Sequence, residues 1–110
     1  MNIYRHGDLT LLTIAKSVIR KLKLKKAKDN VLALGETTGH RHVAVVDRPD
    51  TLSVQDVLDG ALGVKVMEAD TQVEITHQEH KTLVIPKQDT VVLPRREYDW
   101  FAKSTRTVKD

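Results

Sequence analysis

The chain contains no cysteine among its 110 residues, and this absence limits the chemistry that it can perform. Disulfides, thiolate nucleophiles and cysteine-rich zinc motifs are excluded, so any metal ion must be bound by nitrogen and oxygen ligands. No apolar run approaches the roughly 20 residues of a membrane-spanning helix, and residues 1–6 lack the apolar segment of a secretory signal. We therefore expect a soluble protein that is not exported and has no membrane partner.

Acidic residues are missing from 16–28, although the net charge of the whole chain is only +3. Seven of the 18 basic residues lie there, which leaves 11 basic against 15 acidic residues elsewhere. Such a stretch could bind nucleic-acid phosphates or an acidic protein surface, or it could be a solvated face. Aromatic residues, only 4% of the chain, are absent from it, so it has no base-stacking platform. The basic residues are Lys16, Arg20, Lys21, Lys23, Lys25, Lys26 and Lys28.

Short β-rich segments bounded by turn residues dominate the pattern and predict an all-β fold, a small barrel or sandwich with one short helix. We assign residues 1–101 to a single β domain and 102–110 to a polar tail. Residues 31–34 should form a hairpin with 40–46, 63–67 should pair with 71–76, and 83–86 should form a last hairpin with 90–93. Residues 9–14 give a first strand, and Pro94 should end the last one.

Two further segments have helical features. Val54, Val57 and Leu58 follow a candidate cap at Ser53, and this spacing predicts the helix between residues 51 and 62. Residues 15–25 are ambiguous, because their first half has helical spacing and their second half alternates as a strand does. A short helix or an edge strand guarded by lysines would each fit.

All five histidines occur in three short polar clusters, at residues 5–8, 39–42 and 77–80. Histidines used for packing or solubility would occur singly, so this distribution predicts one assembled site. Residues two apart on a strand share a face, which groups His40 with His42 and puts His77 on the face of Val73 and Ile75. The predicted ligands of a transition metal ion, Zn or Fe being candidates, are His40, His42, His77 and His80. A metal-free polar cluster and unrelated surface histidines are the alternatives.

Other polar residues could support this site. His6 could shape a turn, and Asp8 could fix an imidazole tautomer from behind the ligands. Glu79 is the candidate general base on a metal-bound water, although a residue between two inward groups more often points to solvent. Glu97 could support the site or form an ion pair with Arg95. The motifs GxGxxG, GxxxxGKS/T, GxSxG and HExxH are missing, and whether the chain is an enzyme stays open.

Four motifs resemble those of a group of small uncharacterised bacterial and phage-associated proteins. They are RxGD at 5–8, GExTGHxH at 35–42, HxEH at 77–80 and a QREY-like strand at 95–98, where Arg95 replaces the glutamine. The resemblance implies a common small β fold and a viral or prophage origin, without an established activity. It places the chain in the cytoplasm of a bacterium or of a virus-infected cell, or in a virion.

A weaker resemblance is to cupins. Gly35, His40, His42 and Asp47 approximate the first cupin motif, whereas His77 and His80 lack the PxG context of the second. This resemblance implies a similar site chemistry only.

Three functions therefore remain open. The first is a β domain whose histidine cluster binds a transition metal ion. The second is a viral or prophage structural or accessory protein whose histidines stabilise the fold or a contact in a homo-oligomer. The third is a basic nucleic-acid-binding accessory domain.

Overall fold

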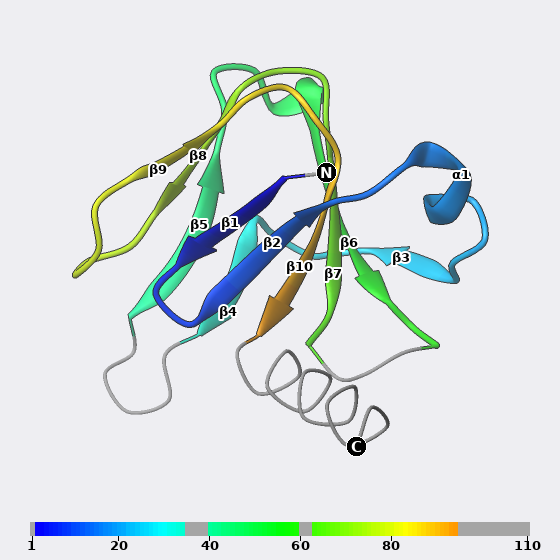
Figure 1. The fold of residues 1–110 in the computed structure, drawn as a ribbon, viewed down its shortest axis with the longest axis horizontal. Coiled ribbons are helices and arrows are strands. Elements are labelled where there is room, and N and C mark those ends of the chain that lie inside the picture. The colour runs from blue at the N-terminus through cyan, green and yellow to red at the C-terminus, as the bar shows by residue number, and fades with distance from the viewer. Residues whose placement is uncertain (1, 35–39, 60–62, 95–110) are drawn as a thin grey trace, which may run out of the picture.

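The computed structural model describes residues 2–34, 40–59 and 63–94, which form two antiparallel sheets (Figure 1). The six-stranded sheet has the order β1-β2-β10-β7-β6-β3, and the four-stranded sheet has the order β4-β5-β8-β9. The strands are β1 (Ile3–His6), β2 (Leu9–Thr13), β3 (Leu24–Lys26), β4 (Val31–Leu34), β5 (Arg41–Val45), β6 (Leu52–Val57), β7 (Lys65–Ala69), β8 (Val73–Thr76), β9 (Leu83–Ile85) and β10 (Thr90–Pro94). The helices are α1 (Lys16–Ile19) and the 3-10 turn η1 (Pro49–Thr51).

The core lies between the two sheets, because each contributes one apolar face to it. On β8, Val73 and Ile75 are buried and Glu74 between them is exposed, the alternation expected of a strand with one solvated face. Both sheets supply the buried cluster, which contains Leu9, Leu11, Leu32, Ala44, Val54, Met67, Ala69, Val73, Ile75, Ile85 and Val92. The predicted all-β class with one short helix is confirmed, and the arrangement is a sandwich, not a closed barrel.

Several local predictions are confirmed. Strands occupy most of residues 9–14, 31–34 and 40–46, and β4 and β5 pair antiparallel as expected. Strand β10 includes Pro94, and the residues after Pro94 lie outside the described part of the chain. The ambiguous stretch 15–25 contains both of its alternatives, α1 and the edge strand β3, which pairs with β6 alone. The turn at 35–39 lies outside the described residues.

The predicted helix between residues 51 and 62 is wrong, because 52–57 form β6. Val54, Val57 and Leu58 do have helical spacing, yet only Val54 is buried and Leu58 is exposed. As a strand, this segment forms ladders with β7 on one side and β3 on the other. These cross-strand contacts outweigh the local spacing.

Two predicted strand pairings are also wrong. Strands β7 and β8 do not pair, because β7 lies in the six-stranded sheet and β8 in the four-stranded one. Strands β9 and β10 are separated in the same way, so the last hairpin does not form. In both places the chain crosses between sheets, which stacks the apolar faces of consecutive strands across the core.

Strand β1 is absent from the sequence-based prediction. Ile3–His6 pairs with β2, with His6 opposite Leu9 across the turn at Gly7 and Asp8. Among the described residues, no helix has the length and apolar character needed to span a membrane.

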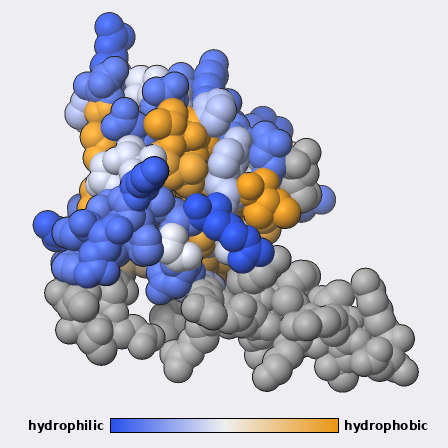
Figure 2. All heavy atoms as spheres, turned by 60° about the vertical axis from the view of Figure 1, so that its left-hand side comes forward, coloured by the Kyte–Doolittle hydropathy of each residue, from blue (hydrophilic) through white to orange (hydrophobic). Residues whose placement is uncertain are grey.

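Exposed apolar residues do not form a continuous face on the four-stranded sheet. Val45 and Val84 are exposed there, and the ladder places charged Glu74 between them. Figure 2, which brings the left-hand side of Figure 1 forward, shows separate hydrophobic patches among hydrophilic residues. This alternation is the ordinary pattern of a solvated sheet face.

Candidate functional site

Three segments that are distant in the sequence bring all five histidines together. His6 ends β1, His42 lies in β5 and His40 precedes it, and His77 and His80 lie between β8 and β9. In Figure 1 these segments meet at the left-hand side of the molecule. The site therefore forms where the first strand of one sheet approaches the β5–β8–β9 part of the other.

Ring contacts define the histidine cluster. The ring centroids of His42 and His77 lie 4.4 Å apart, and those of His77 and His80 lie 4.6 Å apart. His6 is 5.0 Å from His42, 5.7 Å from His80 and 6.3 Å from His77. His40 has a ring contact at 5.6 Å with His77. The prediction of one assembled cluster thus agrees with the geometry, whereas the central place of His6 was not foreseen.

The two buried histidines, His6 and His42, each have a hydrogen-bond partner and face each other. Nε2 of His6 lies 2.7 Å from the carbonyl oxygen of Lys81, and Nε2 of His42 lies 3.2 Å from Oδ1 of Asp8. The two Nδ1 atoms of His6 and His42 face each other at 2.9 Å. A carbonyl and a carboxylate only accept hydrogen bonds, so both Nε2 atoms carry hydrogen. When both rings are neutral, the two Nδ1 atoms therefore point unshared electron pairs at each other.

Burial favours the neutral form of His42 and His77. The side chain of His42 is 3% exposed, and burial is the main reason why its pKa falls to about 4. The neighbouring His77 and His6 rings lower the pKa of His42 further, whereas Asp8 opposes the shift. The pKa of His77 is also lowered, first by desolvation and then by the adjacent histidines. His42 and His77 are thus favoured as neutral imidazole, the form that binds metal ions.

Glu79, in the loop between β8 and β9, contacts both His77 and His40. The backbone N–H of Glu79 donates to Nδ1 of His77 at 3.0 Å. The Glu79 carboxylate lies 3.3 Å from Nδ1 of His40, and its side chain is 63% exposed. Glu79 therefore points toward solvent beside His40 and does not lie over the buried pair. Its assignment as a general base stays a prediction that these contacts do not favour.

Gly7 allows the close approach of two rings. Its φ is +61°, in the left-handed region that glycine adopts without strain. A Cβ at this position would lie 2.7 Å from Nε2 of His80 and 3.0 Å from Cε1 of His42. The tight turn between β1 and β2 thus needs glycine for its backbone and for the space that the histidine cluster occupies.

The metal prediction is not confirmed by this arrangement. Within residues 2–34, 40–59 and 63–94, no three histidine or acidic side chains are disposed to hold a metal ion. Asp8 contacts a ring of the cluster, as predicted for a supporting residue, and its partner is His42. Glu97 lies outside the described residues. The sequence predicts a turn-shaping role for His6, whereas His6 ends β1 and pairs with Leu9. Its place in one of the three polar clusters is the sequence signal that it belongs to the site.

The basic residues of 16–28 lie away from this cluster. Lys16 forms ion pairs within the protein, since its Nζ lies 2.6 Å from a carboxylate oxygen of Glu68 and 3.1 Å from one of Asp89. The other six side chains are exposed, and they lie on β3 and in the segments beside it, on the right-hand side of Figure 1.

Comparison with known proteins gives a family and no named relative. The family model described as a domain of unknown function (DUF8820) matches residues 5–88. No curated protein and no solved structure matches the chain. The match includes every histidine, Asp8 and Glu79, and it agrees with the predicted resemblance to an uncharacterised family that spans most of the chain.

Proposed function

We propose a function for a chain that belongs to a family of domains of unknown function, DUF8820: its histidine cluster binds one divalent transition metal ion, with Nδ1 of His6 and Nδ1 of His42 as the first two ligands. The observation that carries this proposal is the 2.9 Å separation of these two atoms. It changes the ligand set that the sequence suggested, because His6 joins the set and His40 and His77 leave it.

The hydrogen bonds of the two rings support this assignment. Histidines that bind a metal ion usually donate their other ring N–H to a carboxylate or a backbone carbonyl, which fixes the tautomer. His42 has Asp8 in this role, and His6 has the carbonyl of Lys81. The two Nδ1 electron pairs therefore lie close together, and a cation bound by both nitrogens would remove their mutual repulsion.

The distances also fit a shared ion. Two nitrogens bound to one ion at about 2.0–2.1 Å lie roughly 3 Å apart when the angle between them is near 90–110°. The Nδ1 atoms of His6 and His42 already have this separation. Imidazole is a borderline donor, so Zn²⁺ or Fe²⁺ suits such a pair better than Mg²⁺ or Ca²⁺.

A third ligand has to come from a ring that turns. His80 is the best candidate, because its side chain is exposed and its ring lies 5.7 Å from His6 and 6.1 Å from His42. His77 is less suited, because its Nδ1 accepts the backbone N–H of Glu79. One rotation of an exposed side chain would thus complete a three-nitrogen site with room for water.

Metal analysis and titration test the proposal. Protein made without a histidine tag should contain about one ion per chain, and the chelator-treated protein should bind Co²⁺ or Zn²⁺ in calorimetry. His6→Ala and His42→Ala should each lower the affinity at least about 100-fold. Asp8→Ala should lower it about 10–100-fold, the usual effect of losing a carboxylate behind a metal-binding histidine. His40→Ala is the matched control, and it should stay within a few-fold of the parent protein.

Two results would overturn this assignment. If none of the ions binds, or if all histidine variants bind alike, the cluster is not a metal site. If His40→Ala removes binding and His6→Ala does not, the ligands are the HxH pair on β5 and the proposed pair is wrong. Thermal melts give an independent readout, since an ion present at 100 times its Kd should add about 2.7 kcal/mol to the free energy of unfolding.

A viral or prophage role stays a prediction from the resemblance of the motifs. A structural role for the ion is the simpler one here, because the metal would join β1 to β5 and thereby tie the two sheets together.

A further inference from the structure

We propose that the edge of the six-stranded sheet at β3, with the residues that flank this strand, binds duplex nucleic acid through the phosphates, independently of the histidine cluster. We call this surface the basic edge. It contains six residues, Arg20, Lys21, Lys23, Lys25, Lys26 and Lys28, all of them exposed.

The charges of the basic edge are not neutralised within the described part of the chain. Lys16 forms ion pairs with Glu68 and Asp89, whereas the six side chains of the basic edge form none with any described residue. Outside the six, the chain has 12 basic and 15 acidic residues, a net charge of −3. The molecule is therefore polarised, and its field favours approach of a polyanion to this edge.

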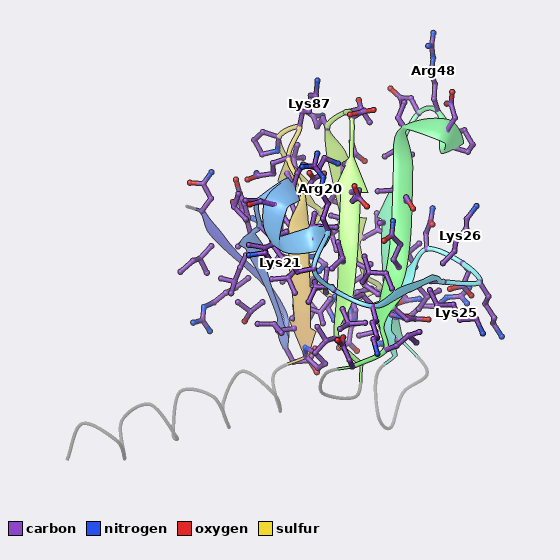
Figure 3. The ribbon with its side chains drawn as sticks, turned by 90° about the vertical axis from the view of Figure 1, so that its right-hand side faces the viewer. Arg20, Lys21, Lys25, Lys26, Arg48 and Lys87 are labelled. Carbon is purple, nitrogen blue, oxygen red and sulfur yellow. The ribbon has the colours of Figure 1, made fainter. Side chains whose placement is uncertain are left out.

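The shape of the basic edge fits the groove of a duplex better than a flat anionic surface. Lys25 and Lys26 are consecutive on the edge strand β3, so their side chains project to opposite faces of the sheet. Figure 3 shows these two side chains diverging from β3, with Arg20 and Lys21 at the end of α1. Positive charge on both flanks of a protruding strand matches a groove with phosphates on both walls.

The strand register shows on which face of the sheet Lys25 and Lys26 each lie. Lys25 is opposite Asp56, which already bonds to Lys65, and Lys26 is opposite uncharged Gln55. Helix α1 covers the face that carries Glu68, since Lys16 pairs with Glu68 there. Because Gln55 Nε2 also donates to Glu68, Lys26 lies on the same face as α1, and Lys25 lies on the other.

Other polyanions fit less well. A membrane surface is flat and would meet only one flank, and stable interfacial binding needs a larger apolar face than the single exposed Val18 of this stretch. Single strands are usually bound with aromatic stacking, and residues 16–28 contain no aromatic residue. The major groove of a duplex is about 12 Å wide and admits a β-ribbon.

Fluorescence anisotropy with a labelled 20-base-pair DNA tests the proposal. With six phosphate contacts, the slope of log K against log salt should be about −5, which is about a thousandfold loss of affinity between 50 and 200 mM salt. The double variant Lys25→Gln, Lys26→Gln should reduce that slope by about 2. DNA of scrambled sequence should bind equally well, because the contacts involve phosphates and not bases.

The matched control is Arg48→Gln with Lys87→Gln, which removes the same charge from exposed residues elsewhere, near one end of the sandwich (Figure 3). It should leave the slope within about 0.5 of the parent protein. His42→Ala and added chelator should leave it unchanged as well, so failure of the metal site does not affect this test.

Several results would overturn the proposal. One is no binding to the duplex at 50 mM salt, and another is an equal loss in the two double variants. Tighter binding to vesicles with 30% phosphatidylserine, or to a single strand of the same length, would assign the basic edge to a membrane or to single strands instead.

Discussion

The histidine cluster and the basic edge are two polar regions of this domain, and they differ in burial. In the cluster, His6 and His42 are buried, contact each other and find hydrogen-bond partners in Lys81 and Asp8. In the basic edge, the six charged side chains are exposed and unpaired among the described residues. Burial makes the distances between atoms decisive in the first region, whereas the exposed charges of the second create an electric field that salt screens.

Acid should destabilise the chelator-treated protein, and this is the largest effect we expect. The folded-state pKa of His42 is about 4, below the ordinary value of 6.5. Between these values the unfolded chain binds a proton that the folded chain does not, so stability is full above pH 6.5 and falls toward pH 4. The loss should be about 2.4 kcal/mol between pH 7 and pH 4.5, measured by urea unfolding at the two pH values.

Titration of the His42 ring by NMR provides the control for this prediction. A ring that stays charged at pH 7 would mean that a proton, rather than a metal ion, lies between the two Nδ1 atoms. It would also remove the contrast between a neutral cluster and a charged edge.

Gly7→Ala should destabilise the protein by about 2 kcal/mol or more. A left-handed backbone costs an L-residue about 1–2 kcal/mol, and the new Cβ would lie 3.0 Å from buried His42 in addition. Gly63→Ala is the control, because its φ is +84° and its Cβ would lie 3.2 Å from Pro94, away from the histidines. Metal affinity should fall in the first variant only. Equal affinities would mean that the β1–β2 turn does not position the cluster.

Lys16→Ala should have the smallest effect, about 1 kcal/mol or less at low salt. Lys16 is 55% exposed, and ion pairs of that kind contribute little to stability. Its removal should leave the salt dependence of DNA binding unchanged, because its charge is already paired. If Lys16→Ala changed that slope as much as Lys26→Gln does, Lys16 would belong to the DNA-binding surface. Thermal melts and anisotropy on the same samples give both readouts.

Local patterns predicted the strands better than their partners. The alternation in 73–76 and the turn residues around 35–39 located β8 and the β4–β5 hairpin, since both signals lie within a few residues. The assignment of β7 with β8 failed because pairing depends on which sheet each strand joins. The helix predicted after residue 51 failed for a related reason, since the spacing of Val54 and Val57 did not reveal β3 and β7 on either side.

The candidate site was predicted in part. Three clusters containing all five histidines indicated one site, and their rings do meet. The pairing of His6 with His42 was not predictable, because it depends on β1 approaching β5 across the two sheets. The position of Glu97 lies outside the described residues, so its role stays a prediction.

The amino-acid sequence by itself determined the all-β class, the gathering of histidine into three short segments and the excess of positive charge at 16–28. Composition and short-range alternation carry this information, because strand periodicity and charge are properties of neighbouring residues. Only the tertiary structure decided which imidazole nitrogens face each other and which lysines stay unpaired. These contacts join residues 36 to 52 positions apart, and such pairs depend on how the sheets pack.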